Sequence, residues 1–408
     1  MIKKWVHLSF IYLIVVGLLG IFLRMMFFFP VEGVNYRYFL HAHSHVAFLG
    51  WVFNALFAGL IFVYIPEKSR QYRLLFSLLQ IAVVGMLVTF PIQGYAAASI
   101  SFTSIHVFLS WWFAAKFIRD VQKHKAHFHR LSLPFVKWSL FFMVLSSIGP
   151  FALGVIMAKG LSGPIANLAI YFYLHFQYDG WFTFAVFGLF FWLVEKHNLL
   201  IPAYYIRRFF ILLATACMPA YALSTLWAHP PSWVYAVGMV AATLQLFALA
   251  YLIVIIKKLR TQLKPTLTTR TSQLFIFALI SFSIKIVLQF ASAFPALADL
   301  AYTVRNFTIG YLHIVFLGFI TVFLIGWFVQ MQIIHLGKHI ITIALLFFLS
   351  GFVFSELLIF LQPILAMQGA VLPYYHETLF GISILMPLGI GLLTYFSFEK
   401  VSLENSKF

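Results

Sequence analysis

Long apolar stretches separated by short polar loops run through the whole chain. About twelve of them are long enough to cross a bilayer, which takes roughly 20 apolar residues in a helix. Because backbone groups in lipid must be hydrogen-bonded internally, stretches of this kind predict helices. We expect membrane spans near residues 8–29, 42–65, 73–94, 101–118, 137–158, 165–194, 208–226, 232–256, 272–292, 306–328, 340–361 and 376–397.

The composition agrees with this pattern. Hydrophobic residues make up 63% of the 408 positions and charged residues 9%, whereas a soluble domain is about 45–50% apolar. We therefore predict an all-α membrane protein with about twelve transmembrane helices, in which residues 1–408 form a single polytopic domain.

The positions of the basic residues predict the orientation. Lys and Arg gather in the loops that stay in the cytoplasm, and with Met1 inside, the outer loops hold Arg37, Lys159 and Arg305. This places both termini in the cytoplasm and the chain in the inner (cytoplasmic) membrane. The net charge of +17 follows from this bias and does not indicate a nucleic-acid partner. The cytoplasmic basic runs are Lys3/Lys4, Lys68/Arg70/Arg73, Lys123/Lys125/Arg130, Arg207/Arg208 and Lys257/Lys258/Arg260/Lys264.

Histidines are the candidate ligands. A single cysteine, Cys217, leaves no thiolate cluster, so a metal would be held by histidine, by carboxylate or within a haem. His41, His43 and His45 occupy alternate positions at the outer end of the second stretch. Because imidazole beside hydrocarbon is costly, this group predicts a metal or haem site.

Two further histidines enter the membrane from the same face as His45. With Met1 inside, His175 of the sixth stretch and His313 of the tenth also lie near the outer surface. His45 and His313 have similar depths within their helices. One porphyrin between those helices would receive both imidazoles as axial ligands.

Several charged groups lie at membrane depth. Asp179 follows His175 by four residues, so both lie on one helix face. An unpaired carboxylate there costs about 2.5–3.5 kcal/mol, so Asp179 needs a cation, a proton or a hydrogen-bond donor.

Lys285 and Glu356 have opposite charges and are candidates to pair or to relay protons. His376 and Glu377 are candidates to join His41 and His43 in a copper site, whereas His106 is interpreted as structural.

The motifs around these histidines resemble the catalytic subunit of the haem-copper oxidases, especially nitric oxide reductases and the oxidases with b- and c-type haems. That family has twelve helices, with redox ligands on helices two, six, seven and ten. The segment from His45 to Tyr64-Ile65-Pro66-Glu67 resembles its second helix, and Tyr311-Leu312-His313 followed by Gly318 resembles its tenth. The resemblance implies that His45 and His313 bind a low-spin haem b.

Two other segments extend the resemblance. The nitric oxide reductase pattern His-x-x-x-Glu-Gly-x-Trp is similar to the segment that runs from His175 through Asp179 to Phe182, which implies that His175 and Asp179 bind a second metal, copper or non-haem iron. The His43-Ser44-His45 segment also resembles the NnrS-type haem and copper membrane proteins linked to nitric oxide stress. The histidine-pair helix of those proteins and a later helix that contains Leu-His match His43, His45 and Leu312-His313.

The seventh helix departs from the family. Leu223 and Ser224 stand where its copper-binding His-His pair is expected, and Tyr311 stands where the ligand of the active-site haem is expected. Neither Leu nor Ser is a useful ligand for copper or iron. The low-spin haem pair is therefore retained without the dinuclear centre, and no catalytic residue is assigned. A bis-histidine haem passes electrons but offers no open position to O₂ or NO.

These features predict a haem-binding member of the haem-copper oxidase superfamily that acts in electron transport or nitric oxide-related redox chemistry. Its expected partners are membrane lipid, a cytochrome or quinol electron donor and other subunits of the respiratory chain. Two alternatives stay open. One is an active terminal oxidase or nitric oxide reductase with unusual ligands such as His41, His43 or His229. The other is a transporter with a histidine metal site, although the matching broken spans typical of transporters are not evident.

Overall fold

The computed structural model describes residues 1–123, 130–334 and 339–404, with side chains described to residue 397. These residues form helices joined by short connections, and the described ranges contain no β-strand. The all-α prediction is therefore confirmed. The helices group into two compact units, Met1–Phe113 with Met331–Phe408, and Ala114–Gln330. A single domain over the whole chain stays a prediction.

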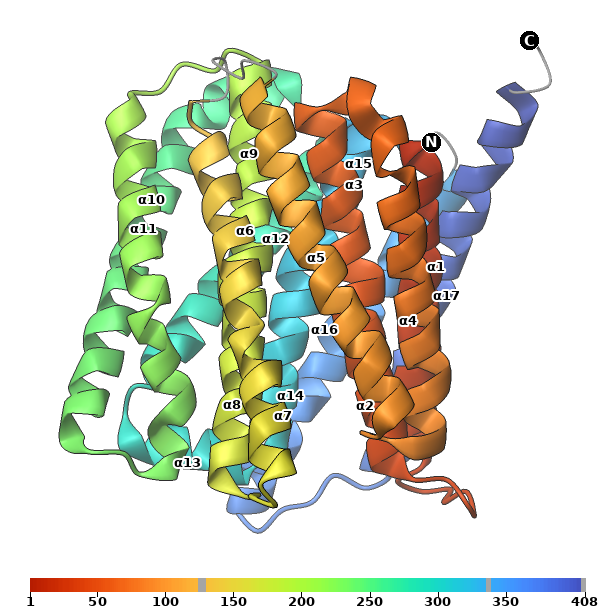
Figure 1. Cartoon of the computed structure of the whole chain (residues 1–408), viewed down its shortest axis with the longest axis vertical. Coiled ribbons are helices and arrows are strands. Elements are labelled where there is room, and N and C mark those ends of the chain that lie inside the picture. Colours follow the sequence, from red (N-terminus) through yellow and green to blue (C-terminus); the bar gives the residue numbers. More distant parts are fainter. Residues whose placement is uncertain (124–129, 335–338, 405–408) are drawn as a thin grey trace. The chain divides into compact units, whose positions relative to one another are not determined.

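The first unit holds the N-terminal and C-terminal helices. Its α2, η1 and α3 join into one continuous helix from Tyr36 to Tyr64. Helix α1 begins and helix α17 ends at the same end of this unit (Figure 1). The elements are α1 (Ile2–Met25), α2 (Tyr36–His45), η1 (Val46–Val52), α3 (Phe53–Tyr64), η2 (Pro66–Tyr72), α4 (Arg73–Gln93), the start of α5 (Ala97–Lys123), α16 (His339–Met367) and α17 (Tyr375–Glu404).

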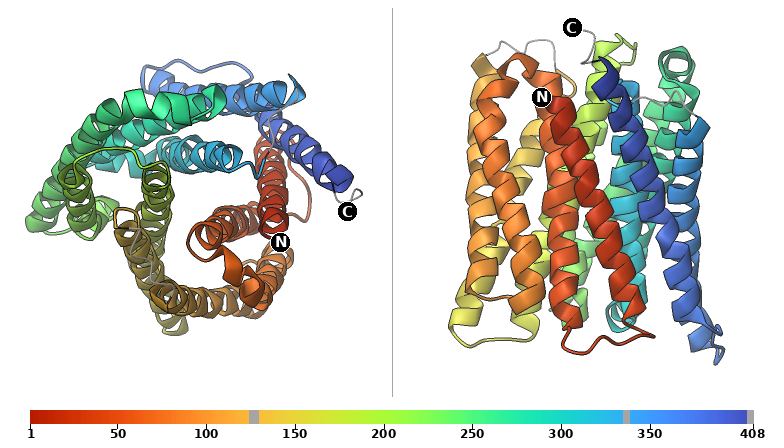
Figure 2. Two further views of the ribbon diagram at one scale, coloured as in Figure 1. Left: turned by 90° about the horizontal axis from the view of Figure 1, so that it is seen from above. Right: turned by 90° about the vertical axis from the view of Figure 1, so that its right-hand side faces the viewer.

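The second unit holds the middle of the chain. As in the first unit, its long helices run roughly parallel to one another (Figure 2). Its elements are α6 (Leu133–Ser146), α7 (Ile148–Ala158), α8 (Pro164–His175), η3 (Phe176–Phe182), α9 (Thr183–Lys196), α10 (Ala203–Cys217), η4 (Pro219–Ala228), α11 (Ser232–Thr266), α12 (Thr269–Ala291), α13 (Pro295–Thr303), α14 (Arg305–His313), η5 (Ile314–Thr321) and α15 (Val322–Gln330).

Within the described residues, 11 helices are long and apolar enough to cross a membrane. They correspond to eleven of the twelve predicted stretches. The remaining stretch, 165–194, lies in a helix that continues without a break from Pro164 to Lys196. Gln177 and Asp179 lower its apolar character. The chain is therefore a multi-pass helical membrane protein, and its sixth span stays a prediction.

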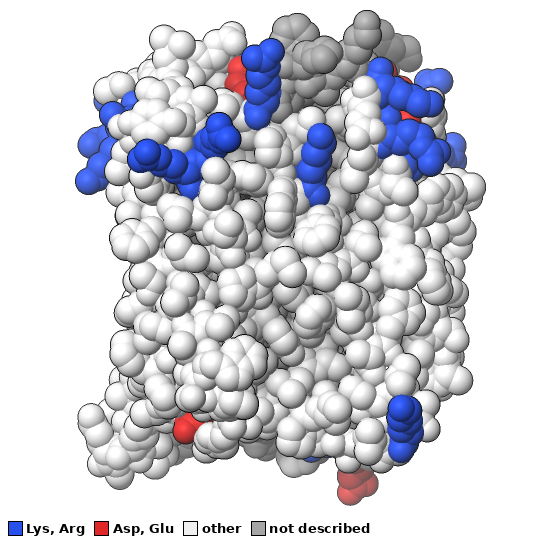
Figure 3. All heavy atoms as spheres, turned by 60° about the vertical axis from the view of Figure 1, so that its left-hand side comes forward, with Lys and Arg blue, Asp and Glu red and all other residues white. Residues whose placement is uncertain are grey.

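The spans differ in how much of their surface the protein covers. The most apolar windows of Tyr36–Tyr64 and Arg305–Gln330 are 89% and 83% buried, whereas those of the other candidate spans are at most 44% buried. The less buried helices expose large apolar side chains such as Trp233 and Val240. Lys and Arg side chains lie near the helix ends, and the surface between them is almost free of charge (Figure 3). Such a surface suits contact with lipid tails.

The three most enclosed helices share a sequence motif. Each contains His, then Gly five residues later, then an aromatic residue: HVAFLGW, HFQYDGW and HIVFLGF, which begin at His45, His175 and His313. In each, a π-helical segment begins directly after the histidine. π-Helices account for well under 1% of residues in globular proteins and often occur at functional sites. The repeat therefore marks these three histidines as equivalent positions.

The glycine of the motif permits close helix packing in two of the repeats. A Cβ added at Gly50 would lie 3.0 Å from the ring of Tyr12 in α1, and one added at Gly180 would lie 2.5 Å from Cβ of Phe142 in α6. Small residues let the backbones of membrane helices approach closely. Of these two π-segments, η1 is thus held against α1 and η3 against α6.

Candidate functional site

His45 is positioned as a candidate ligand of the first unit. It ends α2, and its Nδ1 lies 2.9 Å from the carbonyl oxygen of His41, one turn earlier. Because a carbonyl oxygen only accepts, Nδ1 carries the proton and Nε2 keeps its lone pair. The ring packs against Phe90 of α4, with centroids 4.3 Å apart, and His45 as a whole residue is half-buried. This tautomer is the one that a metal-ligating histidine usually adopts.

The other two histidines of α2 point in different directions. The ring of His41 lies against Tyr95, with centroids 4.5 Å apart, so it shares the Phe90–Tyr95 side with His45. His43 faces α1 instead, with its Nδ1 3.0 Å from the carbonyl oxygen of Val16. Residues two apart on a helix do not share a face. The spacing of alternate histidines therefore separates His43 from the other two.

The copper site expected from His41, His43, His376 and Glu377 has no cluster to support it. His376 stacks on Phe27, with ring centroids 5.0 Å apart. Within the described residues, no three His, Cys, Asp or Glu side chains come close enough to hold one metal ion. A copper site at these positions stays a prediction.

His106 is more unusual than the sequence suggested. It lies in α5, it is buried, and no hydrogen-bond partner is present at its Nε2 among the described residues. Its ring meets Phe53 edge-on, with centroids 4.8 Å apart, and it lies within electrostatic range of His45. The first unit therefore brings His45 and His106 into the same neighbourhood.

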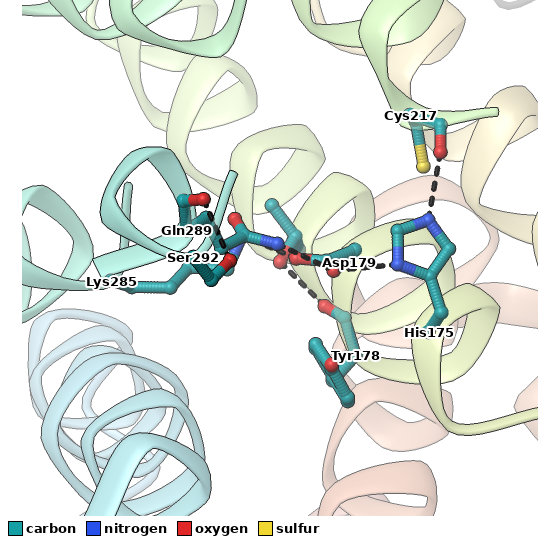
Figure 4. Close-up of polar contacts among 8 residues, drawn as sticks. His175, Tyr178, Asp179, Cys217, Lys285, Gln289 and Ser292 are labelled. Carbon is teal, nitrogen blue, oxygen red and sulfur yellow. Dashed lines mark hydrogen bonds and ion pairs between the residues drawn. The ribbon is translucent and has the colours of Figure 1, made fainter. Parts of the chain in front are cut away.

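In the second unit, His175 is enclosed by two polar partners (Figure 4). Its Nε2 lies 2.8 Å from the carbonyl oxygen of Cys217 at the end of α10. Its Nδ1 lies 3.0 Å from Oδ2 of Asp179, one turn later. This second contact is close enough for an ion pair but lacks hydrogen-bond geometry. Both ring nitrogens of His175 thus face protein oxygen atoms.

The carboxylate of Asp179 is surrounded by protein groups from α12. Lys285 Nζ forms an ion pair with Oδ1, and Gln289 Nε2 donates to Oδ2 at 3.0 Å. Lys285 also donates to Oε1 of Gln289 at 2.9 Å. The side chains of Lys285 and Asp179 are 1% and 2% exposed. A cation and a donor therefore satisfy Asp179, and this set of contacts does not fit a metal ion.

Lys285 thus has Asp179 as its acidic partner. Glu356, the acid that the sequence analysis considered beside it, belongs to the first unit and lies within electrostatic range of Arg24 in α1. Each of these intramembrane charges therefore has an oppositely charged group in its own unit, as expected where charge is buried in a membrane.

His313 ends α14 and is half-buried. Its helix contacts that of His175, because the rings of Tyr311 in α14 and Tyr178 in η3 lie with centroids 6.0 Å apart. Leu223 and Ser224, which the sequence resemblance places opposite a copper-binding pair, lie in the 3₁₀ segment Pro219–Ala228. His229 follows this segment in a left-handed conformation, with φ of 50°.

In comparisons with known proteins, no family profile and no curated protein matched this chain. The resemblance to haem-copper oxidases and to NnrS-type proteins therefore depends on the short motifs around His45, His175 and His313.

Two features of the site were missed by sequence reasoning. The role of Lys285 as the counterion of Asp179 has no local signal, because the two residues lie on helices far apart in the chain. The His-x-x-x-x-Gly-aromatic motif, in contrast, can be seen in the sequence, where it occurs three times. Its copies lie farther apart along the chain than the repeats of ordinary solenoid proteins do.

Proposed function

We propose that this chain is a haem-binding multi-pass protein of the inner membrane, with both termini in the cytoplasm, that belongs to the haem-copper oxidase superfamily. It carries a low-spin b-type haem and acts in electron transfer or nitric oxide-related redox chemistry. The observation that supports this proposal best is the state of His45. Its Nδ1 donates to a backbone carbonyl, so Nε2 carries the lone pair that iron would bind.

The residues around His45 suit a haem ligand. The carbonyl of His41 fixes the tautomer and the orientation of the ring, and such outer contacts raise the basicity of a ligating imidazole. Phe90 and Tyr95 pack against the ring and supply apolar surface beside it. A bound haem with two imidazole ligands would supply one-electron transfer.

The second axial ligand in this proposal is His313. It comes from the sequence resemblance and from the repeat, in which His313 is equivalent to His45. His45 and His313 belong to different units, so their pairing stays a prediction. A second metal at His175 and Asp179 is not part of the proposal, because Lys285 and Gln289 already satisfy the carboxylate of Asp179.

Haem content measured on the purified full chain tests the proposal. We expect about one haem b per chain in the wild type and its loss in His45→Ala. The matched control is His7→Ala, which removes a buried imidazole from α1 of the same unit and should keep the haem. Wild-type protein expressed with ample haem that contains none would refute the proposal.

A further inference from the structure

Cations and tyrosines gather where α10 begins and α11 ends. We call this group the α10–α11 cluster: Tyr204, Tyr205 and Arg208 of α10 with Tyr251 and Lys258 of α11. The two helices pack against each other within the second unit (Figure 1). Tyr204, Arg208 and Lys258 are exposed, so the cluster lies on the surface of the protein.

The tyrosines hold both cations in place. Arg208 Nη1 donates to the hydroxyl oxygen of Tyr251 at 2.9 Å, and its guanidinium group lies 5.4 Å from the ring centroid of Tyr204. Nζ of Lys258 lies 5.0 Å from the ring centroid of Tyr205. The rings of Tyr204 and Tyr205 are 4.0 Å apart. Because cation–π contacts within about 6 Å are attractive, the adjacent rings fix the two cations side by side.

The two cations lack an acidic partner. Among the described residues, no carboxylate forms an ion pair with Arg208 or Lys258. The hydroxyl group of Tyr251 accepts from one of the five N–H groups of the guanidinium. An anion with several oxygen atoms would use the remaining donors and neutralise both charges. A phosphate group suits this role, because Arg binds phosphate through two parallel hydrogen bonds.

An exposed apolar strip continues from the cluster along both helices. Ile211 follows Arg208 by three residues in α10, and Phe247 precedes Tyr251 by four residues in α11, so each shares a helix face with the cluster. Ile211 and Phe247 are 43% and 57% exposed. A phosphate group joined to an apolar chain would contact the cations and this strip together. A free phosphate ion would contact the cations alone.

Hydrogen bonds between the two helices hold the cluster in shape. Gln262 of α11 accepts from the backbone N–H of Leu200 at 2.7 Å and donates to the carbonyl oxygen of Leu200 at 2.9 Å. Leu200 lies just before α10 begins at Ala203. The Arg208–Tyr251 bond is a second link. Because the site is formed in advance, a ligand would bind without a large cost of ordering these side chains.

We propose that the α10–α11 cluster binds the phosphate group of an anionic phospholipid, whose acyl chain lies along Ile211 and Phe247. With Met1 in the cytoplasm, this end of the helices faces the cytoplasmic leaflet, where basic residues attract anionic lipids. The inference is independent of the haem proposal, since it uses contacts of α10 and α11 alone.

Native mass spectrometry of the full chain, stripped of lipid in detergent and titrated with phosphatidylglycerol, tests the inference. We expect Arg208→Gln/Lys258→Gln to weaken binding of the lipid roughly 30-fold, because two contacts to the phosphate are lost. The matched control is Arg207→Gln/Lys257→Gln, which removes two exposed cations of the same helices. It should weaken binding by at most about threefold, because salt screens charges that do not touch the phosphate.

A milder variant tests the positioning of Arg208. Tyr251→Phe keeps the ring and removes the hydroxyl group, so it should weaken binding of phosphatidylglycerol severalfold without a change in Tm. It also replaces the double variant if that variant does not fold. Binding of phosphatidylglycerol to Tyr251→Phe as tight as to the wild type would count against the inference.

Three further results would overturn the inference. Equal losses in the two double variants would indicate general attraction of lipid to a basic surface. Displacement of phosphatidylglycerol by a moderate excess of inorganic phosphate would indicate a site for a free anion. Equally tight binding of phosphatidylcholine, which carries no net charge, would show that the cluster does not select anionic lipid.

Discussion

Lys285 and Asp179 form an ion pair between α12 and η3 in the interior of the second unit. Neither side chain has access to water, so each depends on the other for the compensation of its charge. Removing one partner of a buried pair leaves an uncompensated charge, which costs about 3–5 kcal/mol, whereas replacing both partners by apolar groups is often neutral.

The first prediction follows from this pair. Lys285→Met should destabilise the protein by about 3–5 kcal/mol, because Asp179 would remain buried without its cation. The double variant Lys285→Met/Asp179→Leu should recover most of the loss. Thermal unfolding of the purified protein in detergent measures both effects.

The Lys116–Asp120 pair provides the control. It lies within one helix and is partly exposed, so Lys116→Met should cost no more than about 1 kcal/mol. Equal losses from Lys116→Met and Lys285→Met would contradict the importance assigned to the buried pair.

A second prediction concerns the packing of the π-segments. Gly180→Ala should destabilise the protein by about 1–3 kcal/mol, because the new Cβ would lie 2.5 Å from Cβ of Phe142. Gly154→Ala in α7 is the matched control, since no neighbouring atom lies within 4 Å of the position of its Cβ. Unfolding in detergent should separate the two variants. A Gly180→Ala variant as stable as Gly154→Ala would show that η3 and α6 are not closely packed.

A third prediction tests the orientation. A cysteine at Gln71, in η2, should react with a membrane-impermeant thiol reagent only after the cells are opened, whereas one at Ser162, between α7 and α8, should react in intact cells. Both positions are exposed, and the native Cys217 is buried. Labelling of Gln71→Cys from outside would reverse the predicted topology. The basic Lys123–Arg130 loop, also predicted to be cytoplasmic, includes residues 124–129, which lie outside the described residues.

The helices were largely predictable because hydropathy acts over a whole span. The predicted spans 42–65 and 376–397 lie within or close to the helices Tyr36–Tyr64 and Tyr375–Glu404. The observed helices extend beyond the apolar stretches at their ends. The short helix Pro295–Thr303 was not predicted, since it is too short to produce a hydropathy signal. Helix ends depend on capping and loop geometry, which a hydropathy window does not record.

The candidate site was less predictable. Sequence spacing correctly places His175 and Asp179 on one face, with the two side chains 3.0 Å apart. It does not reveal that Lys285 would reach them, because that contact depends on how α12 packs against η3. The divergence of His43 from His41 and His45 follows from helix geometry alone and was predictable.

A fourth prediction concerns the variant that removes one ligand of the proposed haem. His313→Gly should open a coordination position on the iron, so carbon monoxide should change the reduced spectrum of this variant. His229→Gly, which removes a histidine from a loop in the same unit, should behave as the wild type. A His313→Gly spectrum that is insensitive to carbon monoxide, with haem still bound, would assign the second ligand to another residue.

The most direct test of the central proposal is one optical experiment on the purified wild-type chain, a reduced-minus-oxidised spectrum followed by addition of carbon monoxide. We predict the sharp bands of a low-spin b-type haem that carbon monoxide leaves almost unchanged, because two imidazoles saturate the iron. A strong carbon monoxide difference spectrum would indicate an open, oxidase-like haem, and the absence of any haem band would contradict the proposed function.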